Sequence, residues 1–269
     1  MLNDRRFRKG YIDGPTGQIH YRECGAGEPL VLLHQSPLSG AMFAPAMPLL
    51  AERGLRVVAI DSPGYGMSDV PESPLGLAEF ADAIAEAIDT LFSASVHLLG
   101  HHTGAAVAAN IAVRHSASVK RLVLNGVPLL SADERAFFES LEFGPRVPAA
   151  DGSHLIDVWN QRLAASPGWT NLAAMHKHVV DMLATGDRYG DAFRAVFAHD
   201  MAGDLAAIAC PTLILTNTGE DLYAASKRAH AERPDMQFVS LDGGTHDIVD
   251  EQPENWSRVV ADFLVVTTA

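Results

Sequence analysis

Residues 96–109 read VHLLGHHTGAAVAA, and this stretch organises the rest of the chain. It predicts a short buried strand, one sharp turn and a helix rich in small residues. Gly100 and Gly104 flank the turn at the spacing of the G-x-S-x-G motif, in which a strand delivers a nucleophile on a strained bend at the start of a helix. Glycine is needed on both sides because the bend leaves no room for a Cβ atom. The centre of that motif normally holds Ser, Cys or Asp, whereas here it is His102.

The length, charge and cysteine content of the chain limit the kinds of protein it can be. With 269 residues, 48% of them hydrophobic, it can bury one α/β domain that carries an insertion. The net charge is −13 and the one basic cluster lies within residues 5–9, so we expect no nucleic-acid partner. Cys24 and Cys210 lie in no metal-binding spacing, which favours buried, reduced thiols. No apolar leader or membrane-length run is present, so we expect a cytoplasmic protein that does not bind membranes.

Short apolar runs alternate with helical periods in the first and last parts of the chain. Besides the strand before the turn, the expected strands are residues 7–13, 18–24, 29–33, 56–60, 119–124, 211–216 and 237–241. Helical periods occur at residues 42–53 and 77–92, after Ala224, and at the end of the chain. Because strands and helices alternate, the pattern predicts a mostly parallel, twisted sheet with helices on both faces.

The alternation stops between residues 128 and 209, where only helical periods and loops occur. We interpret this segment as an all-helical cap over the carboxyl edge of the sheet. The α/β core would then comprise residues 1–127 and 210–269.

Four landmarks together resemble the α/β-hydrolase family over essentially the whole chain. In the family's order they are LHQSP at 33–37, DSPGYGMS at 61–68, GHHTG at 100–104 and GGTH at 243–246. The helical insertion lies where the lids of the family lie. The resemblance implies an α/β-hydrolase fold and the catalytic order nucleophile, acid, histidine.

The resemblance also implies the roles of particular residues. The catalytic histidine carries over to His246, and the acid lies in the loop at residues 217–221. We expect Asp221, because the run that begins there matches the family's entry into the next helix, and Glu220 is the alternative. Backbone N–H groups of Ser36 and Thr103 would form the oxyanion hole.

The pocket should lie between the turn and the cap. Gln35 stands where the family usually has Gly, so its amide either reaches the site as a donor or packs under the loop. His34 is most often structural in the family. The candidate substrate contacts are His34, Gln35, His101, Phe138, Trp159, Trp169 and Met175, and Phe197 is a further candidate for the lining. Three arginines could anchor an anionic group, although nothing singles one out: Arg146, Arg162 and Arg188. The cap histidines, expected at the surface, are His154, His176, His178 and His199.

His102 at the apex leaves several chemistries open. We expect hydrolysis of an ester, lactone or similar acyl bond in a small, largely apolar substrate, without a cofactor. His102 could act as the nucleophile through an acyl-imidazole. We favour a mechanism in which Asp221 orients His246 and His246 activates a water, while His102 positions that water or donates to the oxyanion.

Two other classes of function remain as alternatives. One is non-hydrolytic acid–base chemistry on the same fold, by a lyase, an isomerase or a cofactor-free oxygenase, and the other is a ligand-binding pseudoenzyme. We expect no metal, because the adjacent His101 and His102 point in different directions on a bend and no H-x-x-x-H spacing occurs. The expected partner is a small-molecule substrate, and a homodimer stays open.

Overall fold

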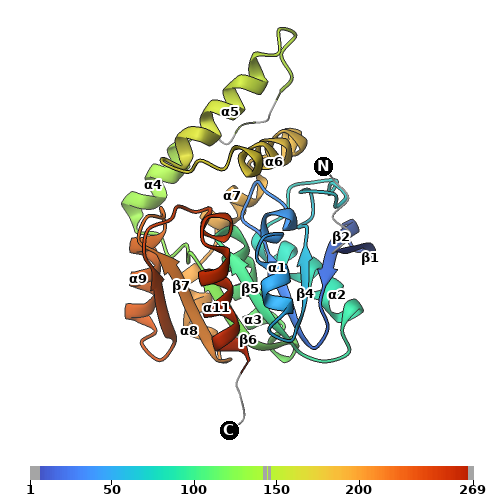
Figure 1. Ribbon diagram of the computed structural model, residues 1–269, viewed down its shortest axis with the longest axis vertical. Coiled ribbons are helices and arrows are strands. Elements are labelled where there is room, and N and C mark those ends of the chain that lie inside the picture. Colours follow the sequence, from blue (N-terminus) through green and yellow to red (C-terminus); the bar gives the residue numbers. More distant parts are fainter. Residues whose placement is uncertain (1–6, 142–143, 145–146, 266–269) are drawn as a thin grey trace.

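The structure, a computed structural model, describes residues 7–141, 144 and 147–265 and is built around an eight-stranded sheet (Figure 1). The strand order is β1-β2-β4-β3-β5-β6-β7-β8. The first hairpin, β1–β2, is antiparallel and joins β4 in antiparallel register, whereas the other neighbouring strands are parallel. The strands are β1 Arg8–Gly14, β2 Gly17–Cys24, β3 Glu28–Leu33, β4 Leu55–Ile60, β5 Val96–His101, β6 Val119–Asn125, β7 Thr212–Asn217 and β8 Gln237–Leu241. The predicted α/β-hydrolase architecture is confirmed.

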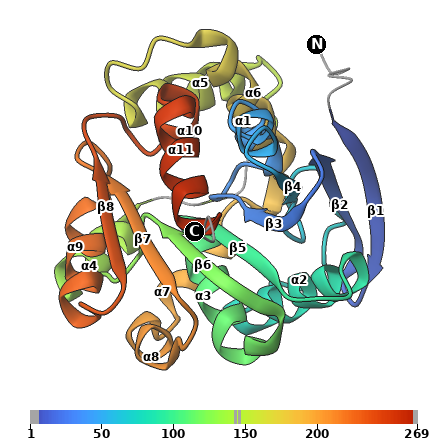
Figure 2. The ribbon, with the colours of Figure 1, turned by 60° about the horizontal axis from the view of Figure 1, so that its bottom comes forward.

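Helices cover both faces of the sheet (Figure 2). One face carries α1 (Met47–Ala51) and α11 (Pro253–Leu264), and the other carries α2 (Leu77–Leu91) and α3 (Thr103–Arg114). The strands in the middle are buried on both sides, which explains their continuous apolar runs: every residue of β5 and of β7 is buried. Two apolar clusters result, one on each face.

Two local features differ from the expectation. The helical period expected at 42–53 is divided into a 3-10 turn, Gly40–Phe43, and the short helix α1. Pro45 lies between them, and a proline lacks the N–H that a continuous helix would need there. Within the described residues Cys24 and Cys210 form no disulfide, and both are half-buried where buried positions were expected, since they lie at the end of β2 and just before β7.

The described residues of the segment between β6 and β7 form helices and loops, without a strand. Its helices are α4 Ala132–Ser140, α5 Ser153–Ala165, α6 Leu172–Ala184, α7 Asp191–Phe197 and α8 Met201–Ala207. Figure 1 shows α4, α5 and α6 standing above the sheet, which is the position expected of a cap. The last helix, α8, packs instead against α3, and its Met201 and Leu205 join the core cluster on that face.

The loop between β7 and β8 contains α9 (Tyr223–Glu232), and the short helix α10 (Ile248–Glu251) precedes α11. The indole of Trp256 on α11 is fully buried, and its Nε1 donates to Oδ1 of Asn125 at the end of β6, at 2.6 Å. This bond joins the last helix to the strand beside the predicted turn. In the described ranges, no helix is both long enough and apolar enough to cross a membrane.

Candidate active site

The turn after β5 has the strained geometry that the sequence predicts. His102 has φ 51° and ψ −108°, and it is the one non-glycine residue with positive φ in the described part of the chain. A conformation of this kind costs about 1–3 kcal/mol. A Cβ atom at Gly100 would lie 2.0 Å from the carbonyl oxygen of Gly104, and one at Gly104 would lie 2.2 Å from that of Leu33. Both glycines are therefore required for His102 to reach the apex.

The surroundings of the apex accommodate an imidazole ring. The N–H of His102 donates to the carbonyl of Asn125 at 2.8 Å. The residue that follows β6, Gly126, has φ 69°, and a Cβ there would lie 2.2 Å from Cδ2 of His102 and 2.8 Å from Oε2 of Glu220. The missing side chain at Gly126 thus makes the space that the ring occupies.

A buried carboxylate pairs with this ring. Nε2 of His102 lies 2.5 Å from Oε2 of Glu220, whose side chain is completely buried. The other oxygen of Glu220 accepts from the hydroxyl of Thr216 and lies 3.4 Å from the N–H of Asn217. A carboxylate is retained in the interior only when such partners satisfy it. The residue that the sequence left as the alternative partner of His246 is therefore the partner of His102.

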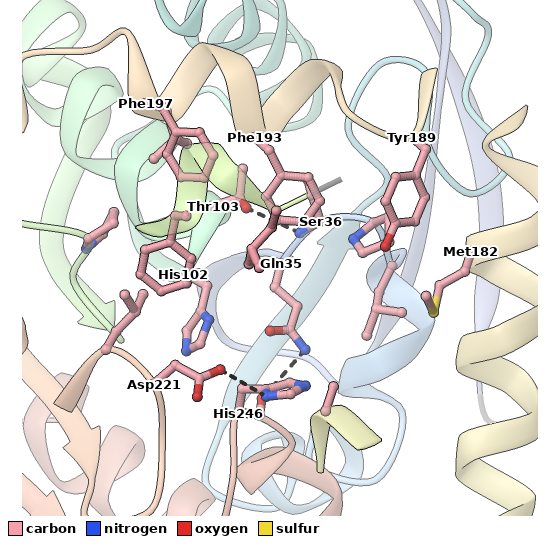
Figure 3. A pocket seen from close by; sticks show the side chains of 18 of the residues that line it. Gln35, Ser36, His102, Thr103, Met182, Tyr189, Phe193, Phe197, Asp221 and His246 are labelled. Atoms are coloured by element: carbon pink, nitrogen blue, oxygen red, sulfur yellow. Dashed lines mark hydrogen bonds and ion pairs between the residues drawn. The ribbon is translucent and has the colours of Figure 1, made fainter. Parts of the chain in front are cut away.

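The predicted pair of Asp221 and His246 is also present, in a looser form. Nδ1 of His246 lies 3.7 Å from Oδ2 of Asp221, which is an ion-pair distance and too long for a hydrogen bond (Figure 3). The side chain of Asp221 is 65% exposed. Interaction with His246 lowers the pKa of Asp221 below its usual value.

The two imidazoles face each other across a cavity. The ring centres of His102 and His246 are 6.2 Å apart, and both residues line the same pocket of about 260 Å³. Figure 3 shows the ring of His102 above His246, with Gln35 beside both. Nδ1 of His102 has no hydrogen-bond partner among the described residues, so this nitrogen is available to a bound molecule.

The expected oxyanion-hole residues line the same pocket as His102 and His246. Ser36 and Thr103 both line it, and the N–H of Ser36 donates to Oγ1 of Thr103 at 3.3 Å. Thr103 begins α3, where the helix dipole presents positive charge. Of the two alternatives for Gln35, its amide reaches the site: the residue lines the pocket, and its Nε2 donates to the carbonyl of His246 at 3.4 Å.

The two other histidines near the apex do not line the pocket, which corrects their expected role as substrate contacts. His34 is buried; its Nδ1 donates to the carbonyl of Gln35 and its Nε2 accepts from the N–H of Ser62, both at 2.9 Å. His101 is fully buried with its ring centre 4.6 Å from that of His102. Burial lowers the pKa of His101 well below its usual value, so this ring is neutral.

Apolar side chains of the cap form the far wall of the pocket. Phe138 lines it as expected, together with Phe193 and Phe197. The ring of Phe197 stacks on that of Phe138, with 6.1 Å between ring centres, and on that of Phe193, with 6.4 Å between ring centres. The other apolar lining residues are Pro37, Leu38, Pro128, Leu130, Leu141, Ala165, Met182, Tyr189, Val196 and Leu222.

Three expected substrate contacts in the cap are not part of this wall: Trp159, Trp169 and Met175. Trp169 and Met175 pack together in a small cluster that Trp159 contacts. Trp159 on α5, Trp169 in the loop that follows and Met175 on α6 pack against one another where α5 contacts α6, away from the pocket. Spacing alone identifies a buried face without saying which element covers it.

A buried polar cluster joins the cap to the residue after His246, and the sequence did not predict it. Arg162 on α5 contacts the carboxylate of Asp247, and the hydroxyl of Ser166 donates to the same oxygen at 2.6 Å. His178 on α6, expected at the surface, is buried, with Nδ1 3.5 Å from Asp247. Burial alone would raise the pKa of Asp247, but the charges of His246, Arg162 and His178 hold it well below its usual value.

The remaining charged candidates lie elsewhere. The guanidinium of Arg188 donates to the carbonyls of Pro71 and Glu72. Arg146, and Arg5 and Arg6 of the basic cluster, lie outside the described residues. Across the described ranges, no group of three or more His, Cys, Asp or Glu side chains could hold a metal ion.

Comparison with known proteins identifies the family. Residues 28–177 match the family described as alpha/beta hydrolase fold. The (E)-2-((N-methylformamido)methylene)succinate hydrolase of Acinetobacter baylyi is 30% identical over 256 residues, which cover 92% of this chain and 94% of the relative. The 2-(acetamidomethylene)succinate hydrolase of Mesorhizobium japonicum is 26% identical, covering 91% of each chain.

Among solved structures, the bromoperoxidase from Bacillus anthracis superposes with a TM-score of 0.83 at 21% identity, covering 96% of this chain and 99% of its own. This likeness concerns the fold alone. The family match spans more than half of the sequence and the relative from Acinetobacter aligns over nearly all of it. The chain therefore belongs to the alpha/beta hydrolase family.

Proposed function

We propose that this protein hydrolyses an ester, lactone or similar acyl bond of a small, largely apolar substrate, and that His102 with Glu220 is the general base. The similarity to two named hydrolases supports hydrolysis. The wall of aromatic and aliphatic side chains supports an apolar substrate, because such pockets bind ligands mainly by burying apolar surface.

The observation that carries the proposal is the 2.5 Å contact between Nε2 of His102 and the buried carboxylate of Glu220. A carboxylate is an acceptor, so it holds the ring proton on Nε2 and leaves Nδ1 free to take a proton. It also stabilises the imidazolium that forms when Nδ1 does so. This is the function that the acid performs for histidine in a Ser-His-Asp triad, applied here to an imidazole at the apex.

In the proposed reaction, a water held between His102 and His246 attacks the carbonyl carbon of the substrate. Nδ1 of His102 removes a proton from the water, and the carbonyl oxygen gains negative charge near the N–H groups of Ser36 and Thr103. The bond between the carbonyl carbon and the leaving group then breaks. The proton on His102 passes to the leaving group, which restores the neutral ring.

His246 and Asp221 form the opposite side of the cleft and hold the attacking water by hydrogen bonds. The 6.2 Å between ring centres is wide enough for one water or a reacting carbonyl. This assignment reverses the roles expected from the sequence, in which His246 activated the water. The reason is that the carboxylate beside His102 is closer and completely buried, whereas Asp221 is mostly exposed.

A second candidate is non-hydrolytic acid–base chemistry in the same pocket. The observation in its favour is that two imidazoles, rather than an imidazole and a hydroxyl, face each other across the cavity. One ring could remove a proton from a substrate carbon while the other returns a proton elsewhere.

The test compares the native protein with His102→Asn on a panel of aryl esters, lactones and amides. Asparagine tolerates positive φ better than most residues, so the turn should survive the change. We expect kcat/KM to fall by about 10²–10⁴-fold. Rapid-quench mass spectrometry should find no acyl group on the native protein during turnover.

Three outcomes would change the assignment. Undiminished hydrolysis by His102→Asn would remove His102 from the chemistry. An acyl adduct on His102 would make this residue the nucleophile. Exchange of substrate carbon-bound hydrogen with D₂O, without hydrolysis of any acyl substrate, would favour the second candidate.

A further inference from the structure

The carboxylate of Asp247 lies near Nε2 of His246. Its Oδ2 is 3.5 Å from Nε2 of His246, and the hydroxyl of Ser166 is 3.4 Å from the same nitrogen. Nδ1, on the other side of the ring, faces the mostly exposed Asp221 at 3.7 Å. Figure 3 shows the two ring nitrogens of His246 on opposite sides, with Asp221 next to the one nearer to His102.

This arrangement repeats the one around His102. In both imidazoles Nε2 faces a buried carboxylate, Glu220 for one ring and Asp247 for the other. Ser166 already uses its proton to bond Asp247 at 2.6 Å, so both groups nearest Nε2 of His246 are acceptors toward the ring. Nε2 is then the nitrogen that carries the ring proton, and Nδ1 is presented to the cleft.

The cap supplies the partners that hold Asp247 in place. Arg162 from α5, Ser166 just after the end of α5 and His178 from α6 converge on its carboxylate. All four side chains are almost completely buried. Arg162 also donates to Ser166 at 2.7 Å and lies over the ring of Trp169, which fixes its position further. A further carboxylate lies on the other side of His178: Oδ2 of Asp250 is 3.2 Å from Nε2 of His178.

The same cluster touches the pocket. Arg162 lines the cavity that holds His102 and His246, so one cap side chain borders the substrate space and fixes Asp247. Separating the cap from the core would leave both Arg162 and Asp247 without their buried partner, which is strongly unfavourable. The position of the cap and the orientation of His246 are therefore linked through these contacts.

We propose that Asp247, held by Arg162 and Ser166 of the cap, is the positioning residue for His246, and that this ring is correctly oriented only while the cap is docked. The inference rests on the proposed function for the use made of His246. The location of the ring proton on Nε2 of His246, and the dependence of the ring's orientation on the cap, can be tested without a known substrate.

The test uses the full chain labelled with ¹⁵N-histidine. The ring ¹⁵N shifts, assigned by the loss of signal in His246→Gln, should show the native ring of His246 protonated at Nε2. Asp247→Asn keeps the shape of the side chain but replaces one acceptor oxygen with a donor, so it should change this pattern. Ser166→Ala removes one cap contact with little change in volume and should change it in part.

The matched control is Ser39→Ala. Ser39 bonds Asp181 of α6 at 2.6 Å, so its loss also removes a polar contact between cap and core, but one that does not touch Asp247. We expect native His246 signals in this variant.

Turnover provides a second readout wherever the proposed hydrolysis is found. Asp247→Asn should lower kcat by about 10- to 100-fold, the effect of a misplaced catalytic group, while KM changes by less than about threefold. Ser39→Ala should keep the native kcat.

Unchanged His246 signals in a folded Asp247→Asn variant would overturn the inference. If Asp247→Asn does not fold, Ser166→Ala decides in the same way. Because the ring signals are read without substrate, failure of the proposed hydrolysis and failure of this inference give different results.

Discussion

Glu220 and Asp221 are consecutive residues, yet their carboxylates face different histidines. Glu220 is completely buried 2.5 Å from His102, and Asp221 is 65% exposed 3.7 Å from His246. One loop after β7 therefore provides the acid for the apex ring and the acid at the opposite side of the cleft. The difference in burial gives the two pairs different strengths, because a buried charge pair is screened much less by water and salt.

This difference predicts unequal effects of neutralising the two acids. Glu220→Gln should lower kcat/KM by about 10²–10⁴-fold, because the amide can donate to Nε2 and so move the ring proton of His102 to Nδ1. Asp221→Asn should cost about tenfold or less, because its contact is longer and exposed to solvent. Steady-state kinetics of both variants, with circular dichroism to confirm folding, checks the order. A larger loss in Asp221→Asn would return the principal base to His246.

The space beside the apex predicts a specific loss of stability at Gly126. Gly126→Ala would place a Cβ 2.2 Å from the ring of His102 at φ 69°, whereas Gly152→Ala meets nothing within 4 Å at φ 77°. The strain of positive φ alone should cost about 1 kcal/mol in Gly152→Ala. Gly126→Ala should lose about 1–3 kcal/mol more, because the ring must move. Urea denaturation of both variants measures the difference, and equal losses would show that the ring is not confined there.

The absence of a hydroxyl at the apex predicts the response to a fluorophosphonate probe. Such probes react with an activated serine, and the apex holds His102. We expect the native protein to remain unlabelled under conditions in which an ordinary serine esterase of this family is labelled completely. Mass spectrometry of the intact protein provides the readout. Stoichiometric labelling would identify a serine nucleophile elsewhere, and peptide mapping would locate it.

Buried neutral histidines predict acid sensitivity of the fold. Burial lowers the pKa of His97 from 6.5 to about 4, and the charge of Lys120 contributes. The unfolded chain takes up this proton below pH 6.5 and the folded chain does not, so stability is lost as pH falls from about 6.5 to 4 and is constant below that. For His97 the loss is at most about 3 kcal/mol. Urea denaturation at pH 7 and pH 4.5 should show a smaller decrease for His97→Leu than for the native chain, and an equal decrease would contradict the prediction.

The aromatic wall predicts selectivity for the acyl or leaving group. Phe197→Ala removes a ring that packs against both Phe138 and Phe193 in the pocket. We expect kcat/KM for a benzoyl or hexanoyl ester to fall by about tenfold or more, since the lost apolar contact is worth about 1.5–3 kcal/mol. An acetyl ester, too short to reach this wall, should lose less than threefold. Equal losses for both esters would place the substrate elsewhere.

Most of the fold could be predicted from local pattern. The expected strands coincide with the observed ones to within one or two residues, as at 237–241, because a strand buried on both faces needs a continuous apolar run bounded by turn residues. The need for Gly100 and Gly104 was also predictable, since it depends on backbone geometry within a few residues.

Prediction failed where the outcome depends on which distant surface covers a side chain. Trp159, Trp169 and Met175 are large apolar residues in the cap sequence, but only the packing around the contact of α5 with α6 shows that they lie against one another and not in the pocket. His178 looks like a surface residue until Asp247 and Asp250, about seventy residues later, are brought beside it.

The sequence by itself determined the α/β-hydrolase fold, the helical cap and the presence of an imidazole at the apex of the turn, because each depends on residues close together in the chain. Only the tertiary structure decided that Glu220 belongs to His102 and that Asp247 lies between His246 and the cap. Neighbouring residues of a loop, such as Glu220 and Asp221, can face opposite sides of the cleft. Residues as distant in sequence as His102 and Asp247 are brought to one site only when the sheet forms. The pairing of charges depends on distances of a few ångströms, which the order of residues along the chain does not contain.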